Sequence, residues 1–140
     1  MLTLAAVPAL FVTACGEKGI QLAENDPYHP AAVLFQQRCS GCHTLDVAGT
    51  EGSAIKANSR ERKDGPNFNQ RKEDYASVMY ALVNGGFASG PMPQNIVVGD
   101  DAKMVACFVA KYSGHDVKRP TGSTATAQSP GLQVQGTCPK

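Results

Sequence analysis

Apolar residues recur three and four positions apart in three stretches of the chain, which is the spacing of one face of an α-helix. No stretch alternates apolar and polar residues for long enough to indicate a β-strand. The pattern therefore predicts an all-α domain in which three main helices are joined by long loops. The apolar positions are Ala31, Leu34 and Phe35 in the first stretch, Tyr75, Val78, Met79 and Leu82 in the second, and Met104, Val105, Phe108, Val109 and Tyr112 in the third.

Residues that favour helix ends mark the limits of these stretches. Pro30 is predicted to begin the first helix, because proline fits the first turn. The second stretch runs over 73–83 and is predicted to stop at residues 84–86, Asn-Gly-Gly, which tolerate the left-handed backbone of a helix end. Asp100 or Asp101 is predicted to cap the third helix, because a carboxylate accepts hydrogen bonds from free backbone N–H groups there.

Residues 1–14 form an apolar run without a charged residue, immediately before Cys15. A short apolar run that ends in small residues is typical of an export signal rather than of a core helix. Residues 12–15, Val-Thr-Ala-Cys, resemble the lipobox of bacterial lipoproteins, which implies cleavage before Cys15 and lipid attachment to that residue. The chain departs from that pattern in having no Lys or Arg before the run, and an ordinary secretory signal is the alternative.

Composition divides the rest of the chain into a linker, one domain and a tail. Residues 15–28 are predicted to be a linker that carries the lipid anchor, and residues 117–140 are predicted to be a tail. The tail is rich in Ser, Thr, Gly and Pro, which bury too little apolar surface to offset the entropy of the chain, so we expect it to be flexible. The predicted domain comprises residues 29–116.

The overall composition excludes several classes of protein. A chain of 140 residues has room for about one domain. Its net charge of +1 argues against a general nucleic-acid binder, which needs a strong basic excess. No apolar run approaches the ~20 residues of a membrane-spanning helix, which excludes a multi-pass membrane protein. Aromatic residues are only 6% of the chain and Trp is absent, so a bound cofactor is well suited to fill part of a thin core.

The sequence C-S-G-C-H at residues 39–43 is the attachment motif of c-type haem. One helical turn carries the thiols of Cys39 and Cys42 to two vinyl groups on one edge of the porphyrin, and His43 then places an imidazole under the iron. A thioredoxin-like dithiol needs a βαβ pattern, which is not visible here. A zinc site needs a second close ligand pair, which the remaining cysteines do not form in the sequence. A chance match is the last alternative.

Met92 is the candidate for the second axial ligand of the iron. It lies in a Gly-rich loop between Pro91 and Pro93, which stiffen the backbone that presents it. A thioether suits low-spin haem iron, and His/Met ligation raises its reduction potential. The alternative is a methionine that only packs against the core. His29 and His115 lie near predicted helix ends beside Pro or Gly, so we expect both at the surface.

These features in this order resemble class I bacterial cytochromes c, over about residues 29–114. The resemblance implies the cytochrome c fold, in which helices and long loops wrap around one covalent haem. It also implies that the carbonyl of Pro66 accepts a hydrogen bond from His43. The matching features are C-x-x-C-H at 39–43, D-G-P-N-F at 64–68 (the family has G-P-N-L), G-P-M-P at 90–93, and the aromatic residues Phe35 and Phe108 of the first and last helices.

An iron with both axial positions filled favours electron transfer over catalysis, so no catalytic residue is predicted. The resemblance implies a carrier of single electrons between respiratory or photosynthetic membrane complexes. Its expected partners are a quinol-oxidising complex and a terminal oxidase or reductase, on the extracytoplasmic face of a bacterial membrane. A fixed haem subunit of a larger oxidoreductase is the alternative, and a small haem enzyme or sensor with an open iron site is a further one.

Cys107 and Cys138 are the two thiols left after the lipid and the haem take theirs. Disulfides persist in the oxidising surroundings of exported proteins, so these two residues are a candidate disulfide. Cys107 lies on the flank of the third helix's apolar face, and Cys138 lies in the tail, which is able to reach it. The alternative is a buried Cys107 and a Cys138 that is free or pairs with another chain.

Positive and negative residues are interleaved between 56 and 74, six positive and four negative. A mixed cluster of this kind is typical of a solvated loop rather than of a basic docking face. We therefore expect this region, which includes Arg71 and Glu73, to be a solvated loop. Residues 47–63 are Gly, Ser, Ala and charged residues in large part, which predicts an extended loop.

Overall fold

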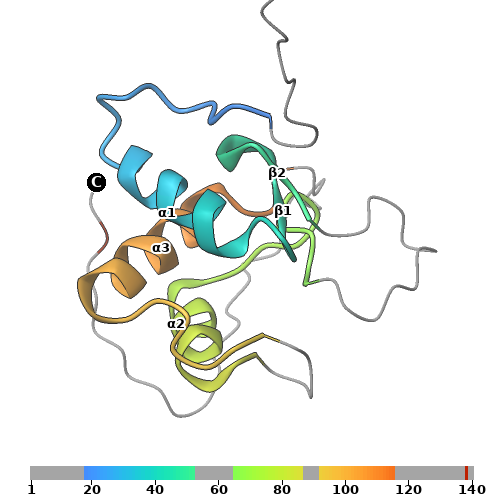
Figure 1. The fold of residues 1–140 in the computed structure, drawn as a ribbon, viewed down its shortest axis with the longest axis vertical. Coiled ribbons are helices and arrows are strands. Elements are labelled where there is room, and N and C mark those ends of the chain that lie inside the picture. Colours follow the sequence, from blue (N-terminus) through green and yellow to red (C-terminus); the bar gives the residue numbers. More distant parts are fainter. Residues whose placement is uncertain (1–17, 53–64, 87–91, 116–137, 139–140) are drawn as a thin grey trace, which may run out of the picture.

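The computed structural model describes residues 18–52, 65–86, 92–115 and 138. Three α-helices and a small hairpin make up this part of the chain (Figure 1). The three helices agree with the periodicity of the sequence, and the chain is helix-rich as predicted. The elements are α1 (His29–Cys39), β1 (Thr44–Leu45), the 3-10 helix η1 (Asp46–Ala48), β2 (Thr50–Glu51), α2 (Tyr75–Asn84) and α3 (Gly99–Tyr112).

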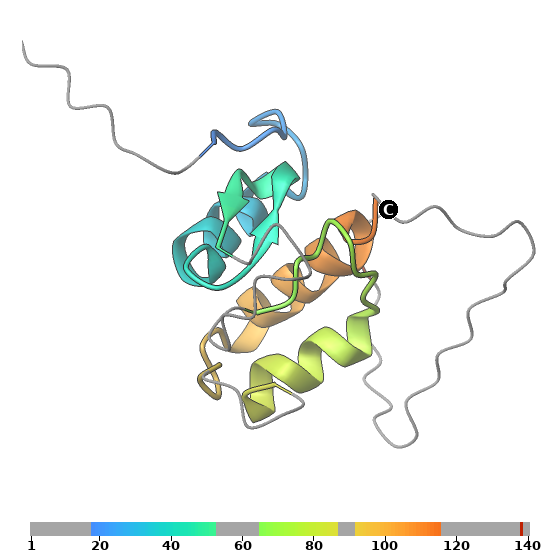
Figure 2. The ribbon, with the colours of Figure 1, turned by 90° about the vertical axis from the view of Figure 1, so that its right-hand side faces the viewer.

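Helix α3 is the centre of the packing, with α1 against one side of it and α2 against another (Figure 2). The rings of Phe35 in α1 and Phe108 in α3 meet with their centroids 5.8 Å apart. Both side chains are fully buried. This aromatic contact lies at the crossing of α1 and α3, and burial of two rings is among the largest single gains in apolar contact that a small core can make.

The first residues of the helices and their caps differ from the prediction by one or a few positions. His29, expected ahead of the first helix, is its first residue, half-buried, so Pro30 is the second. Asp74 caps α2, because its carboxylate accepts a hydrogen bond of 2.8 Å from the backbone N–H of Ser77. The prediction that Asp100 or Asp101 caps α3 is wrong, because both lie inside its first turn. Carboxylates there still face the positive end of the helix dipole.

The hairpin of β1 and β2 was not predicted, because strands of two residues show no alternation. The strands pair antiparallel, with Thr44 opposite Glu51 and Leu45 opposite Thr50. Leu45 also donates its backbone N–H to the hydroxyl of the buried Thr50, at 2.9 Å. The hairpin follows His43 directly and fills residues 44–51, so the predicted extended loop over 47–63 begins as ordered structure. Residues 53–63 lie outside the described residues.

The described part of the predicted linker, residues 18–28, packs on the domain. Ile20 and Leu22 are partly buried against the core, and Gln21 donates its backbone N–H to the carbonyl of Val47 at 3.0 Å. Tyr28 is buried, and its ring meets that of Tyr112 edge to face at 5.8 Å. The predicted signal at 1–14 and the lipid site at Cys15 lie outside the described residues.

Cys107 and Cys138, the candidate pair from cysteine counting, form a disulfide with their Cα atoms 5.4 Å apart. Cys107 is buried in α3, and Cys138 is partly buried against the core. The bond fixes one residue of the predicted tail to the C-terminal helix, while the rest of 117–140 lies outside the described residues. Within the described ranges, no helix has the length and apolar character needed to cross a membrane.

Candidate functional site

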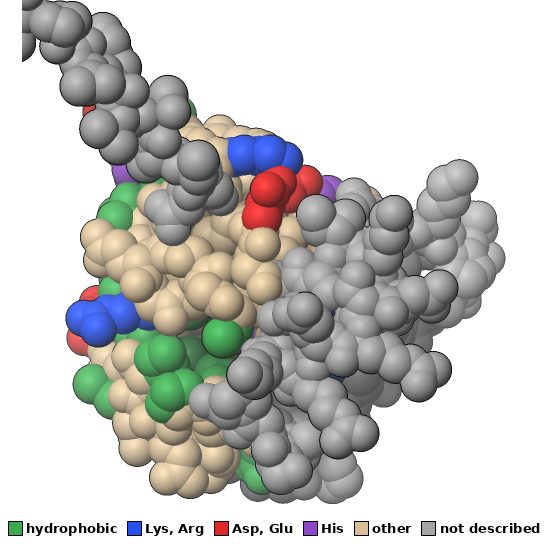
Figure 3. Space-filling model, turned by 45° about the vertical axis from the view of Figure 1, so that its right-hand side comes forward, with side chains coloured by type: hydrophobic (Ala, Val, Ile, Leu, Met, Phe, Trp, Pro, Cys, Tyr) green, Lys and Arg blue, Asp and Glu red, His purple; other side chains and the backbone are tan. Residues whose placement is uncertain are grey.

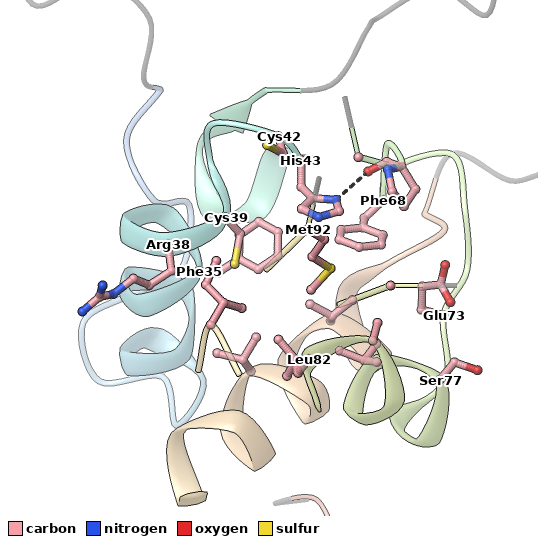
Figure 4. A pocket seen from close by; sticks show the side chains of 18 of the residues that line it. Phe35, Arg38, Cys39, Cys42, His43, Phe68, Glu73, Ser77, Leu82 and Met92 are labelled. Carbon is pink, nitrogen blue, oxygen red and sulfur yellow. Dashed lines mark hydrogen bonds between the residues drawn. The ribbon is translucent and has the colours of Figure 1, made fainter. Parts of the chain in front are cut away.

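A cavity of about 320 Å³ lies where the three helices face the loop that follows the hairpin (Figure 4). Its walls are mainly apolar, and they bring together residues from distant parts of the sequence. In the view of Figure 3, hydrophobic side chains gather on one part of the surface, and charged side chains lie outside that area. The apolar walls include Phe35 from α1, Val78 and Leu82 from α2, and Val105 and Val109 from α3.

Both motif cysteines line the cavity, at the point where α1 ends. Cys39 is the last residue of α1, and the turn after it is closed by bonds of 3.1 Å from Cys42 N–H and 2.9 Å from His43 N–H to its carbonyl. Cys39 is buried, and burial raises the pKa of its thiol to about 12, with the neighbouring Cys42 adding to the shift. Cys42 is exposed. Both sulfurs are free of disulfides.

The imidazole of His43 is held inside the cavity by the carbonyl of Pro66, 3.1 Å from Nδ1 (dashed line in Figure 4). A carbonyl oxygen only accepts, so Nδ1 carries the proton, and Nε2 is left with a free lone pair. Burial lowers the pKa of His43, and the bond to Pro66 opposes that shift in part. A neutral imidazole with a free Nε2 is the form that binds a metal.

Gly65 lies against the same imidazole, beside the ring atoms Cε1 and Nδ1. A Cβ atom at this position would come within 2.2 Å of Cε1 and 2.5 Å of Nδ1 of His43. The backbone of the 65–66 segment therefore approaches the ring as closely as it does only because residue 65 has no side chain.

Met92 enters the cavity from the loop after α2, and its side chain points inward beside His43 (Figure 4). Gly85 makes this approach possible. It ends α2 with a φ of +82°, and a Cβ there would lie 2.8 Å from the carbonyl oxygen of Met92. Pro93 also lines the cavity, whereas Pro91 lies outside the described residues. The structure therefore brings Cys39, Cys42, His43 and Met92, chosen from the sequence, to one cavity.

Four polar side chains at the cavity were not predicted as site residues: Arg38, Arg71, Glu73 and Ser77. Arg71 Nε lies 2.5 Å from Glu73 Oε1, and the Glu73 side chain is only 10% exposed. Burial raises the pKa of Glu73, and the charge of Arg71 opposes that shift. The expectation that Glu73 is solvated is therefore wrong, because the end of α3 covers the loop: Glu73 N–H donates to the Ser113 hydroxyl at 3.0 Å. Ser77 was detectable, since it lies one turn before Ala81 on the cavity face of α2.

The donor set fits a haem rather than a bare metal ion. Two thiols one helical turn apart, an imidazole with a free Nε2, and a thioether all face a cavity with apolar walls, which is what a covalently attached porphyrin with two axial ligands requires. Among the described residues, no group of three or more His, Cys, Asp and Glu side chains lies close enough together to hold a metal ion.

The comparison with solved structures finds two matching chains. No protein-family model matches the chain, and no curated protein matches it. The chain is similar to the c-type cytochrome SorU from Sinorhizobium meliloti, with 31% sequence identity. The match covers 65% of this chain and 95% of that one, with a TM-score of 0.46.

Proposed function

We propose that this chain is a monohaem c-type cytochrome that carries single electrons. The observation that carries the proposal is the meeting of Cys39, Cys42, His43 and Met92 at one apolar cavity, although the sequence separates the first and last of them by more than fifty residues. Cys39 and Cys42 would hold the haem through thioether bonds, and His43 and Met92 would be its axial ligands. The haem, when bound, supplies a one-electron iron couple.

The protein's own residues prepare the site for electron transfer rather than for catalysis. Pro66 fixes the tautomer of His43, so that Nε2 faces the cavity as a ligand. The apolar walls keep water from the site, which favours the less charged, reduced form. With His43 and Met92 both bound, no coordination position remains for a substrate. No side chain is therefore assigned a catalytic role.

The test is the spectrum of the purified haem protein and of its Met92→Ala variant. We expect haem that stays with the denatured chain, a low-spin oxidised spectrum, and the weak near-infrared band of methionine-bound iron. Met92→Ala should lose that band and lower the reduction potential, because the thioether favours ferrous iron. Met79→Ala is the control, since Met79 packs against the core away from the cavity walls and should keep the band.

Three outcomes would refute the assignment of the ligands. They are haem that is released on denaturation, a high-spin spectrum of the native protein, and a near-infrared band that survives in Met92→Ala. The second of these would instead favour a haem enzyme or sensor with an open iron site.

We further propose that the mature chain begins at Cys15 and is anchored by lipid on the extracytoplasmic face of a bacterial membrane. The lipobox-like residues 12–15 support this proposal. Its redox partners would then be membrane complexes, such as a quinol-oxidising complex and a terminal oxidase or reductase. Two or more acyl chains anchor a protein stably, whereas one gives only marginal binding.

Mass spectrometry of the native N-terminus tests the anchor. We expect an acylated Cys15 as the first residue and recovery of the protein in the membrane fraction. Cys15→Ser should abolish acylation and cleavage at this position while leaving haem attachment intact, because Cys39 and Cys42 are untouched. An unmodified residue other than Cys15 at the mature start would exclude the lipoprotein.

A further inference from the structure

The ring of Phe68 stacks on the imidazole of His43. Their centroids are 4.7 Å apart, and their planes are within 9° of parallel. Phe35 also lies near the imidazole, but at 6.3 Å and tilted by 51°. Phe68 is 8% exposed, so this contact is buried. Of these two rings, only Phe68 lies nearly parallel to the imidazole.

The backbone around Phe68 is tied to the two elements that flank it. Its N–H donates to the carbonyl of Thr44, the residue after His43, at 2.8 Å. Its carbonyl accepts from the N–H of Gly114, at the end of α3, at 2.7 Å. On the side-chain end, the ring meets Phe35 at 6.0 Å with the planes inclined by 60°. Contacts at both ends keep the Phe68 ring in one orientation.

Pro66 and Phe68 restrain different motions of the imidazole. The hydrogen bond from Nδ1 to the Pro66 carbonyl fixes where that nitrogen points. This hydrogen bond holds the ring at one nitrogen only, so by itself it restrains rotation of the ring about the Cβ–Cγ bond less than a contact on the ring face does. A parallel ring packed on the imidazole face removes that rotation, because turning would drive the two rings into each other.

We propose that Phe68 is a positioning residue that sets the plane of the axial imidazole and shields it from water. The inference rests on the proposed function, in which His43 binds haem iron. The plane of an axial imidazole determines how unpaired electron density is distributed over the haem in the oxidised state. Apolar shielding of the ligand disfavours the more charged oxidised form and so raises the reduction potential.

The experiment compares Phe68→Leu with Phe68→Tyr and Phe108→Leu in the holoprotein. Phe68→Leu keeps apolar bulk but removes the flat ring, so we expect altered electron paramagnetic resonance g-values, a changed spread of haem methyl shifts in the proton NMR spectrum, and a lower reduction potential. Phe68→Tyr keeps the ring and should restore the g-values and the methyl spread. Phe108→Leu removes another buried ring, which is not a wall of the cavity, and should reduce stability while leaving both spectra unchanged.

Two results would overturn the inference. One is a Phe68→Leu protein with native g-values and methyl spread, and the other is an equal change in Phe108→Leu, which would indicate general loosening of the core. If Phe68→Leu does not fold, the native protein decides: nuclear Overhauser contacts between the Phe68 and His43 rings are expected, and their absence refutes the stack. Failure of the proposed function is a separate result, namely a native protein without low-spin His/Met haem.

Discussion

At the scale of single residues, the segment 65–68 meets the imidazole of His43 in three different ways. Gly65 lets the backbone come against the ring, Pro66 accepts a hydrogen bond from Nδ1–H, and Phe68 stacks on the face. Each contact depends on a different property of its residue: the lack of a side chain, a carbonyl oxygen, and a flat ring. The orientation of the ligand is therefore shared among these three contacts.

Gly65→Ala is expected to displace the imidazole, because the new Cβ would overlap it at 2.2 Å from Cε1. Overpacking of this kind typically costs about 1–3 kcal/mol in the free energy of unfolding. Denaturant unfolding and the intensity of the methionine-to-iron band of the holoprotein measure the two effects. Gly19→Ala is the matched control, since nothing lies within 4 Å of its Cβ position and neither glycine has a positive φ. Equal stability of the two variants would show that the ring gives way freely.

At the scale of elements, α2 is a wall of the cavity whose start depends on one cap. Val78, Ala81 and Leu82 face the cavity from this helix. Asp74 accepts hydrogen bonds from both the backbone N–H and the hydroxyl of Ser77, at 2.8 and 2.9 Å. The helix has only ten residues, so the cap is a large part of what defines its first turn.

Asp74→Ala is expected to lower the free energy of unfolding by about 1 kcal/mol, because the backbone N–H groups of the first turn lose their acceptor. Asp74→Asn keeps an oxygen that accepts the same bond, and it should retain most of the stability. Thermal unfolding of the two variants makes the comparison. An Asp74→Asn variant as unstable as Asp74→Ala would show that charge, not the hydrogen bond, is what α2 requires.

The helices were predictable from the sequence, whereas the hairpin and the contacts between distant residues were not. Helix periodicity, the C-x-x-C-H spacing and the prolines on either side of Met92 are local signals, so three helices, the haem motif and the cavity residues His43 and Met92 were predictable. The strands of the hairpin are too short to leave a pattern. The burial of Glu73 depends on Ser113, forty residues away, and the stacking of Phe68 depends on the path of the loop. Contacts of this kind have no local signal.

At the scale of the whole molecule, the ends of the described chain both return to the helical core. Residues 18–28 lie against α1 and the hairpin region, and the disulfide brings Cys138 to the middle of α3. The disulfide joins positions 31 residues apart, and a closed loop of that length restricts the unfolded chain considerably.

Cys138→Ser is expected to lower the free energy of unfolding by about 3–4 kcal/mol in the chain-entropy model. Cys138 is the better site than Cys107, because serine at the buried position would add an unpaired hydroxyl. The native protein treated with a reductant should unfold like the variant. Thiol counting gives an independent check: the mature, denatured and unreduced haem protein should show no reactive thiol, and two per chain would mean that the bridge is absent.

The burial of Cys39 has a consequence for the reactivity of its thiol. Thiol–disulfide exchange proceeds through the thiolate, and a thiol with a pKa of about 12 is almost wholly protonated at neutral pH. In the folded chain, Cys39 is therefore a poor nucleophile toward disulfides. The Cys39–Cys42 pair contains one thiol that reacts slowly, whereas the fold holds Cys107 and Cys138 together as a disulfide. Of the four cysteines that the structure describes, Cys107 and Cys138 are joined by a disulfide, and Cys39 and Cys42 are left as thiols that haem attachment would use.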